Sequence, residues 1–402
     1  MFGTSGIRGR VGTDVTVALA VSVGRALAAD GAQSVVIGRD PRDSGALLAD
    51  ALAAGCRESG ADVIRLGLAA TPTVARAVGW RDADAGVSVT ASHNPPPDNG
   101  FKLWTAAGQA FPPARQRAIA DRVRSEDWAL ADWDGLGTET DWPGAADRHV
   151  AAITDGVTVD RPLSVVVDLG NGAGGVTVRA LQALGCRVET LNAQPDGRFP
   201  GRPSEPTAET CSSLRRLVAA TDADLGIAHD GDADRMLAVT EDGSWVPGDV
   251  LLALFGRQAA ETGAGDRVAA PLNTSLAVDE ALAAVGATVT RTPVGDVHVA
   301  RAASEPGVVF GGEPSGAWIW PDETRCPDGP LAACRLADLV AEEGPLSALV
   351  EGVDAYPTRR ESIETTAKQA AMDRIAVQCE ERPDADFFNA TTDVIRTLSV
   401  LK

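Results

Sequence analysis

The 402-residue sequence predicts an α/β protein of three tandem, related α/β domains with mostly parallel mixed sheets, followed by a truncated C-terminal α+β domain. One strand–helix–strand pattern recurs over residues 34–64, 164–188 and 267–289, which indicates a repeated supersecondary unit. The strands are unbroken apolar runs, which are typical of buried, mainly parallel sheets. A glycine that can cap the crossover helix precedes the second strand of each copy.

The positions of the copies suggest the domain boundaries. We expect the first domain over 1–147, the second over 148–247 and the third over 248–352. The remaining segment, 353–402, is too short for another unit of the same kind and contains one helical stretch over 366–380. About 150 residues per domain agrees with this division.

Composition excludes several classes of partner. The chain carries 36 basic and 56 acidic residues, a net charge of -20, whereas a nucleic-acid or anionic-membrane surface needs a basic patch. It has no run of about 18 apolar residues that could span a membrane, and its polar N-terminus does not resemble a signal peptide. The six cysteines form no C-x-x-C pair, which suits reduced thiols. We therefore expect a cytoplasmic protein that binds neither nucleic acid nor membrane.

Three aspartates, Asp230, Asp232 and Asp234, stand in a tight loop between two apolar runs. Carboxylates this close repel one another unless a cation or solvent intervenes, and hard oxygen ligands suit Mg²⁺. Arg235 adds a guanidinium that could clamp a phosphate beside the metal. A calcium-binding loop would also use Glu241, but it needs glycine where Arg235 stands. A solvated acidic turn is the other alternative.

A stiff loop within residues 89–102 presents a serine. Three consecutive prolines and an Asn-Gly pair favour a rigid, exposed turn over a helix. A hydroxyl on a rigid loop suits a nucleophile or phosphate acceptor, so Ser92 is the candidate. His93 and Lys102 are candidates for proton transfer and for charge beside a phosphate. The alternative is a proline-rich surface turn.

Weaker signals lie elsewhere in the chain. On the turn at 311–318, Glu313 and Ser315 could hydrogen-bond to sugar hydroxyls, although an ordinary turn would look the same. The turns at 292–296 and 4–9 are equally weak by themselves.

A dinucleotide site is the competing interpretation. Residues Gly170–Gly175 fit the G-x-G-x-x-G pattern directly after a strand, and Glu189 follows about 20 residues on, as in NAD-dependent oxidoreductases. Asp168 argues against it, because its carboxylate would lie close to the pyrophosphate.

Taken in order, four segments resemble the motifs of the α-D-phosphohexomutase family, which includes phosphoglucosamine mutase and phosphomannomutase/phosphoglucomutase. These segments are Phe2–Gly9, Thr90–Pro95, Asp230–Arg235 and Gly312–Gly316. The resemblance extends over roughly residues 1–356, and its details are similar to archaeal-type members.

The resemblance implies a mechanism. Ser92 would carry a phosphoryl group and pass it to a hexose phosphate, giving a hexose 1,6-bisphosphate, which also serves as primer. Mg²⁺ would be held by Asp230, Asp232, Asp234 and a phosphoserine oxygen of Ser92. With His93, the further catalytic residues are Lys102 and Arg8, and the substrate-binding residues are Thr4, Ser5, Arg235, Gly295, Asp296, Glu313 and Ser315.

The chain departs from the family at Pro97-Asp98, where many members have an aromatic residue before Asn-Gly, and at two places that bear on activity. Ala317 stands where many members have a histidine that helps in proton transfer, and residues 353–402 contain no Arg-Ser-Gly-Thr-Glu-Pro-like loop for the distal phosphate. One hypothesis is an active mutase, monomer or homodimer, in which another element or a second chain makes that contact. The other is a truncated, weakly active or inactive remnant with a binding role. Glucosamine, mannose and glucose phosphates are all open as substrates, with glucosamine favoured.

The charge balance also predicts a response to salt. Only three lysines stand beside thirty-three arginines, and the net charge of -20 strains the folded state by self-repulsion that salt relieves. A halophilic origin and a GC-rich genome would both account for this composition. We expect the melting temperature to fall at low ionic strength. Equal melting temperatures in low and multimolar KCl would contradict this.

Overall fold

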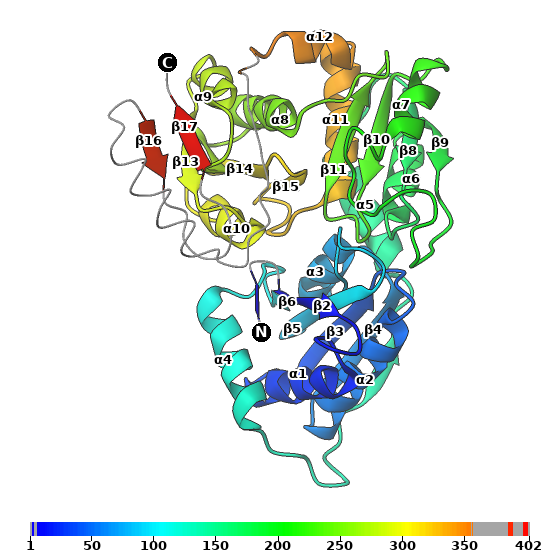
Figure 1. Cartoon of the computed structure of the whole chain (residues 1–402), viewed down its shortest axis with the longest axis vertical. Coiled ribbons are helices and arrows are strands. Elements are labelled where there is room, and N and C mark those ends of the chain that lie inside the picture. The colour runs from blue at the N-terminus through cyan, green and yellow to red at the C-terminus, as the bar shows by residue number, and fades with distance from the viewer. Residues whose placement is uncertain (1, 4–5, 355, 357–384, 389–396, 401–402) are drawn as a thin grey trace.

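The computed structural model describes residues 2–3, 6–354, 356, 385–388 and 397–400. Figure 1 shows three α/β units: the first, blue to cyan, lies below the green second unit and the yellow third unit. Each unit has its own sheet. Most of the neighbouring strands inside these sheets run parallel, whereas several strands at the sheet edges are antiparallel. The predicted fold class is confirmed for these three units.

The first unit consists of β1 (Phe2–Gly3), β2 (Gly6–Arg10), α1 (Val17–Ala29), β3 (Ser34–Arg39), α2 (Gly45–Glu58), β4 (Asp62–Leu68), α3 (Thr71–Trp80), β5 (Ala85–Val89), β6 (Asp98–Thr105), α4 (Pro113–Ser125) and β7 (Glu139–Asp141). Its strands lie in the order β1-β2-β6-β5-β3-β4-β7. The strands β5, β3, β4 and β7 run parallel, whereas β6 is antiparallel to both of its neighbours.

The second unit consists of α5 (Ala145–Gly156), β8 (Ser164–Asp168), α6 (Gly175–Ala183), β9 (Arg187–Leu191), α7 (Ser212–Ala219), β10 (Leu225–His229) and β11 (Met236–Thr240). The third consists of α8 (Gly248–Thr262), β12 (Arg267–Pro271), α9 (Leu276–Ala283), β13 (Thr288–Thr292), α10 (Asp296–Ala303), β14 (Val308–Glu313) and β15 (Ala317–Ile319), and α11 (Gly329–Glu343) and α12 (Leu346–Glu351) follow it. Their sheets have the orders β11-β10-β8-β9 and β13-β12-β14-β15, and only β11 and β15 are antiparallel to their neighbours.

The repeated sequence pattern is confirmed in all three copies. The crossover helices are α2, α6 and α9, and the first strands are β3, β8 and β12. The capping glycines Gly60, Gly185 and Gly286 have φ angles of 88°, 87° and 76°. Glycine adopts this left-handed conformation without steric cost, so it ends each helix and turns the chain into the next strand.

The segment expected as a turn at 311–318 is a β-hairpin. β14 continues through Glu313 and pairs with β15, so that only Pro314, Ser315 and Gly316 reverse the chain. Gly316 has a φ of 100°, which the tight reversal requires. The sequence expectation of a longer turn is corrected, because Gly311 and Gly312 pair within the strand.

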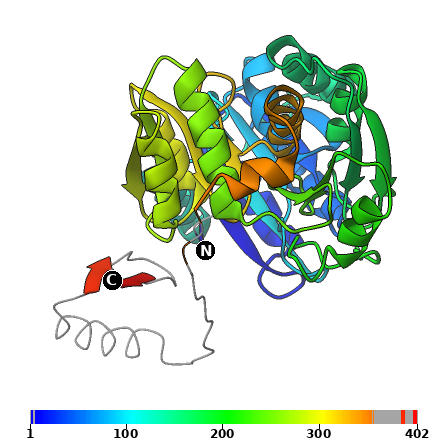
Figure 2. The ribbon, with the colours of Figure 1, turned by 90° about the horizontal axis from the view of Figure 1, so that it is seen from above.

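The second and third units share one hydrophobic core. A single cluster of buried side chains runs from Ile153 to Leu346 and includes residues of both sheets. Helix α11 connects them, because it contacts α6 and β11 of the second unit and β15 of the third. Figure 2, seen from above, shows the two units side by side with α11 between them.

A buried polar cluster ties the first unit to this pair. Asp328, directly before α11, accepts a hydrogen bond from Arg76 Nε on α3 at 2.7 Å, and His149 Nε2 on α5 lies 3.0 Å from the same oxygen. Thr73 Oγ1 on α3 lies 2.8 Å from His149 Nδ1. Burial favours the neutral acid, but His149 and Arg76 outweigh it and hold the pKa of Asp328 well below its usual range. The cluster therefore links three helices that belong to different parts of the fold.

Little of the C-terminal segment is described. β16 (Ala385–Phe388) pairs antiparallel with β17 (Thr397–Val400). The expected helix over 366–380 lies outside the described residues. Among the helices that the structure does describe, none combines the length and apolar character needed to cross a bilayer.

Close packing of α1 and α2 yields a test of the fold. A Cβ at Gly55 would lie 2.2 Å from Val21 O, so we expect Gly55→Ala to force the helices apart and to lower the free energy of unfolding by about 1–3 kcal/mol. Urea denaturation measures this. The control is Gly175→Ala, whose Cβ would meet nothing within 4 Å and which should be close to neutral. Equal losses in both variants would contradict the close approach.

Candidate active site

The polar residues singled out in the sequence come from all three units, and most of them lie in loops. Ser92 follows β5, Asp230 follows β10 and Asp296 begins α10 soon after β13. All three strands present their carboxyl ends here, which is where open α/β sheets bind ligands. The loops enclose a pocket of about 450 Å³. The residues lining it are Gly6, Arg8, Ser92, His93, Asn94, Lys102, Asp234, Arg235, Asn273, Val294, Gly295, Asp296, Glu313, Pro314, Ser315 and Ala317.

Most of the predicted site residues therefore meet in one place. Those that line the pocket are Arg8, Ser92, His93, Lys102, Asp234, Arg235, Gly295, Asp296, Glu313 and Ser315. Asp230 and Asp232 lie beside Asp234 with buried side chains. Thr4 and Ser5, also predicted to bind substrate, lie outside the described residues.

Ser92 has an uncommon backbone conformation. Its φ of 51° lies in the left-handed region, which costs roughly 1–2 kcal/mol for a residue with a side chain. The residue is buried, and its Oγ donates a hydrogen bond to Asp230 Oδ2 at 2.6 Å. Its N–H donates to Thr90 Oγ1 at 2.8 Å, and His93 Nδ1 lies 3.4 Å from Ser92 Oγ. The hydroxyl thus points at the loop of residues 230–235, called here the acidic loop.

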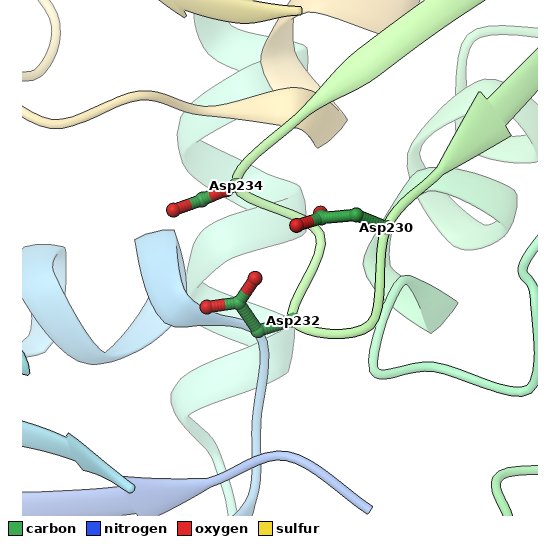
Figure 3. A group of neighbouring side chains, drawn as sticks. All are labelled: Asp230, Asp232 and Asp234. Atoms are coloured by element: carbon green, nitrogen blue, oxygen red, sulfur yellow. The ribbon is translucent and has the colours of Figure 1, made fainter. Parts of the chain in front are cut away.

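The three aspartates of this loop converge. Figure 3 shows Asp230, Asp232 and Asp234 turned toward a common space beside the loop between β10 and β11. One oxygen of each lies within 4.8 Å of the others, and all three residues are buried. Burial and the two neighbouring carboxylates raise the pKa of Asp230 well above its usual value. Burial acts in the same direction on Asp234, but Lys102 and Arg235 outweigh it and lower its pKa to about 2.

The hydrogen bonding of this cluster is incomplete. Asp232 Oδ2 accepts from Thr71 Oγ1 at 2.7 Å, and Asp234 Oδ2 accepts from Lys102 Nζ at 2.9 Å. The second oxygens, Asp232 Oδ1 and Asp234 Oδ1, are buried and have no hydrogen-bond partner among the residues that the structure describes. Buried oxygens of this kind need a cation or an ordered water. Because the donors are all carboxylate oxygens, a small hard cation such as Mg²⁺ fits the cluster.

Lys102, on β6, is buried and charged. Its Nζ donates to Asp234 Oδ2 and, at 2.5 Å, to Asp296 Oδ2. Burial alone would lower the pKa of Lys102, but the two carboxylates raise it above its usual value. One ammonium therefore joins a strand of the first unit to loops of the second and third.

The remaining charged groups give the pocket its cationic side. Within the described part of the chain, the buried Nε of Arg8 has no hydrogen-bond partner, and Arg235 lines the same pocket. Burial, followed by the charges of Arg235 and Arg8, lowers the pKa of His93 to about 3, so its imidazole is neutral at pH 7. Burial and Asp296 raise the pKa of Glu313 to about 7. An anionic ligand would find two guanidinium groups here, together with a carboxyl group that titrates near neutrality.

Two polar residues near the pocket are not singled out in the sequence. Arg42, after β3, donates to the carbonyl oxygen of Ser92 at 2.8 Å. Asn273, after β12, lines the pocket, and its buried Oδ1 finds no partner in the part of the chain that the structure describes. Both follow the carboxyl end of a parallel strand, and that position is the signal that could have identified them.

Protein atoms occupy the space beside the Gly-rich turn after β8. Arg202 Nε donates to Asp168 Oδ2 at 2.8 Å, and a Cβ at Gly170 would lie 2.7 Å from the Arg202 guanidinium carbon. A Cβ at Gly172 would lie 2.7 Å from Gly231 O, so the turn packs directly on the acidic loop. The glycines allow this packing and leave no room for a pyrophosphate. The NAD-dependent oxidoreductase alternative is therefore rejected.

A buried serine hydroxyl, a carboxylate cluster suited to a divalent cation and cationic side chains in one pocket define a phosphoryl-transfer enzyme. Family models described as phosphoglucomutase/phosphomannomutase, alpha/beta/alpha domains I, II and III, match residues 1–130, 147–243 and 247–356. The chain belongs to this family, the α-D-phosphohexomutases, and is an isomerase of that class. The resemblance seen in the four sequence motifs is confirmed.

Two relatives and one solved structure support the same family. The chain is 46% identical over 399 residues to a protein named "Probable phosphoglucosamine mutase" from Methanothermobacter thermautotrophicus, covering 98% of this chain and 86% of that one. A protein of the same name from Methanopyrus kandleri is 47% identical over 367 residues, covering 90% and 81%. The crystal structure of a phosphoglucomutase/phosphomannomutase family protein from Burkholderia thailandensis matches with a TM-score of 0.80 and 31% identity, covering 88% of this chain and 81% of that one.

The acidic cluster predicts a stability that depends on metal. Mg²⁺ at about 100 times its Kd should stabilise the wild-type chain by about 2.7 kcal/mol. Asp232→Asn removes a ligand and relieves like-charge repulsion, so we expect a higher melting temperature without Mg²⁺ and little further rise on adding it. Asp222→Asn, an exposed position in the same unit, is the control and should respond like the wild type. A full Mg²⁺ response in Asp232→Asn would rule out its role as a ligand.

Proposed function

We propose that this phosphohexomutase interconverts glucosamine 6-phosphate and glucosamine 1-phosphate through a phosphorylated Ser92. The observation that carries the mechanism is the 2.6 Å hydrogen bond from Ser92 Oγ to Asp230, at the wall of a pocket that Glu313 and Ser315 also line. The choice of sugar is supported by relatives above 45% identity that are named for glucosamine phosphate.

The reaction consists of two opposite phosphoryl transfers. In the first, the P–O bond to Ser92 Oγ breaks as a sugar hydroxyl oxygen bonds to phosphorus, and a hexose 1,6-bisphosphate forms. The proton that the hydroxyl loses balances the proton that Ser92 Oγ gains. In the second, the bisphosphate lies the other way round and its other phosphoryl group returns to Ser92 Oγ, while the sugar oxygen regains a proton. A hexose 1,6-bisphosphate also primes an enzyme that lacks its phosphate.

Two groups beside the reacting atoms suit these transfers. Lys102 is charged, and its contacts with Asp234 and Asp296 hold its proton, so we assign it positive charge and hydrogen bonding beside the reacting oxygens rather than proton donation. His93 is neutral, and its Nδ1 lies 3.4 Å from Ser92 Oγ, where it can relay the proton that this oxygen gains or loses. Ala317, which lines the pocket, supplies no such group.

Asp230, Asp232 and Asp234, with a phosphoryl oxygen on Ser92, would hold Mg²⁺. When bound, the ion would neutralise charge on the phosphoryl group in transfer. Arg8, on β2 of the first unit, adds positive charge. Its buried Nε, which has no partner among the described residues, could bind a phosphate oxygen.

The third unit is proposed to hold the sugar. Glu313 and Ser315, on the β14–β15 hairpin, face the pocket with Gly295 and Asp296, and Arg235 is available for phosphate. Glu313 Oε1 accepts a hydrogen bond from Gly295 N at 2.8 Å, which fixes the two loops relative to each other. A rigid set of acceptors suits a sugar that must bind in two orientations with similar hydroxyl positions.

Mutase turnover tests the function. With Mg²⁺ and glucose 1,6-bisphosphate as primer, glucosamine 1-phosphate should turn over faster than mannose 1-phosphate or glucose 1-phosphate. Ser92→Ala should lower kcat by at least about 10³-fold, because the phosphoryl acceptor is lost. Ser125→Ala, at an exposed serine of α4, is the matched control and should keep wild-type turnover. A folded, Mg²⁺-binding wild-type chain that turned over none of the three sugars would sink the proposal and favour the weakly active remnant.

A further inference from the structure

We propose that Arg42, through its ion pair with Asp40, is the positioning residue of the serine loop, and that it holds Ser92 in the backbone conformation that directs Oγ at Asp230. This inference rests on the proposed role of Ser92 as phosphoryl acceptor. The loop concerned, called here the serine loop, comprises residues 90–98. Arg42 lies in the turn after β3, about 50 residues earlier in the chain.

The Arg42 guanidinium is completely surrounded by acceptors. Its side chain is fully buried, and Nε donates to Asp40 Oδ2 at 2.9 Å. Its four terminal N–H groups reach four carbonyl oxygens of the serine loop. These are Ser92 O at 2.8 Å and Asn94 O at 2.6 Å from Nη2, and Pro95 O at 2.7 Å and Asp98 O at 2.9 Å from Nη1. All five donors of the guanidinium are thus used, four of them on the serine loop.

The Asp40 carboxylate holds the other side of Ser92. Asp40 Oδ1 accepts from Arg42 N at 3.0 Å, and Oδ2 also accepts from Thr90 Oγ1 at 2.7 Å. Thr90 Oγ1 in turn accepts from Ser92 N at 2.8 Å. The N–H of Ser92 is therefore fixed through the carboxylate, and its C=O is fixed through the guanidinium of the same ion pair.

This double attachment explains the conformation of Ser92. A left-handed φ at a non-glycine residue persists only where surrounding contacts over-determine it. Here the amide before the Ser92 side chain and the carbonyl after it both have one buried partner, so φ cannot relax without breaking a hydrogen bond. The direction of Oγ, and with it the 2.6 Å contact to Asp230, follows from this backbone.

The second unit closes over the same arginine. The Phe199 ring lies with its centroid 5.0 Å from Arg42 Cζ, and a Cβ at Gly197 would lie 2.4 Å from Arg42 Cα. Ser204 Oγ donates to Asn94 O at 3.0 Å. The segment that contains these residues thus packs on the ion pair and shields it from water, which strengthens its hydrogen bonds.

Lysine cannot replace this arginine. An ammonium is a point charge with three donors, whereas the four carbonyl oxygens and Asp40 need five donors in a planar fork. In Arg42→Lys at least two of these five acceptors would lose the donor that Arg42 supplies, and the loop would shift. A misplacement of about 1 Å at a reacting group can lower turnover about 10²-fold.

The test compares Arg42→Lys with Arg65→Lys. Arg65, on β4, is also mostly buried and binds a carbonyl, Ala49 O at 2.6 Å, but it does not contact the serine loop. We expect Arg42→Lys to lower kcat by roughly 10–100-fold with KM changed less than about threefold. The rate at which bisphosphate phosphorylates Ser92, followed by mass spectrometry, should fall by the same factor. Arg65→Lys should change neither rate.

A second pair of variants covers the case in which Arg42→Lys does not fold. Thr90→Val removes the hydroxyl between Asp40 and Ser92 N at nearly constant shape, and Thr90→Ser keeps it. We expect Thr90→Val to slow phosphorylation of Ser92 and Thr90→Ser to restore most of the rate. The proposal is overturned if folded Arg42→Lys or Thr90→Val phosphorylates Ser92 at the wild-type rate, or if Thr90→Ser is as slow as Thr90→Val.

Amide hydrogen exchange separates this proposal from the proposed function. Peptides covering the serine loop should exchange faster in Arg42→Lys, or in Thr90→Val, than in the wild type, whether or not Ser92 accepts a phosphate. A wild-type chain that never gains a phosphate on Ser92 would contradict the proposed function alone. Unchanged exchange in the serine loop of a folded variant would contradict the positioning role alone.

Discussion

Three carboxylates buried within 4.8 Å of one another are the constraint on which the rest of the site depends. Like charges this close are unfavourable unless donors or a cation offset them. The protein donors come mainly from outside the second unit: Ser92 to Asp230, Thr71 to Asp232 and Lys102 to Asp234. All three donors belong to the first unit. The acidic loop therefore has these hydrogen bonds only because the first unit packs against the second. Two oxygens find no hydrogen-bond partner among the described residues, and the proposed cation would complete the balance there.

Strand direction explains why so many functional groups can meet. The acidic loop, the serine loop and the loop from β13 to Asp296 each follow the carboxyl end of a strand, so one topological rule brings all three to the pocket. Lys102 differs from these loops, because it lies within antiparallel β6 and, like Arg8 on β2, reaches the pocket from a strand. A strand holds its side chains more rigidly than a loop, and this suits the group that joins Asp234 to Asp296.

The local sequence pattern was sufficient to predict the three copies of the strand–helix–strand unit, their capping glycines and the two loops with Ser92 and Asp230. Each of these features depends on a short stretch of consecutive residues. The shared core of the second and third units was not predictable, since α11 shows only an ordinary apolar face and the sheet it covers lies far away in the sequence. Arg42 was also missed, although for a different reason. Its partners are carbonyl oxygens, which every residue has, so no residue type marks them.

Stability alone does not account for the buried pair of Arg42 and Asp40. Taking two charges out of water is costly, and apolar side chains of similar volume often give an equally stable core. Such side chains would remove the guanidinium donors from the carbonyls of Ser92 and its neighbours, however, and on our proposal the loop would adopt a relaxed backbone in which Oγ no longer faces Asp230. The ion pair thus accepts a desolvation cost in the core and supplies a single loop conformation. In the proposed mechanism that conformation has to be the same for both phosphoryl transfers, because one serine would both donate the phosphoryl group and receive it back.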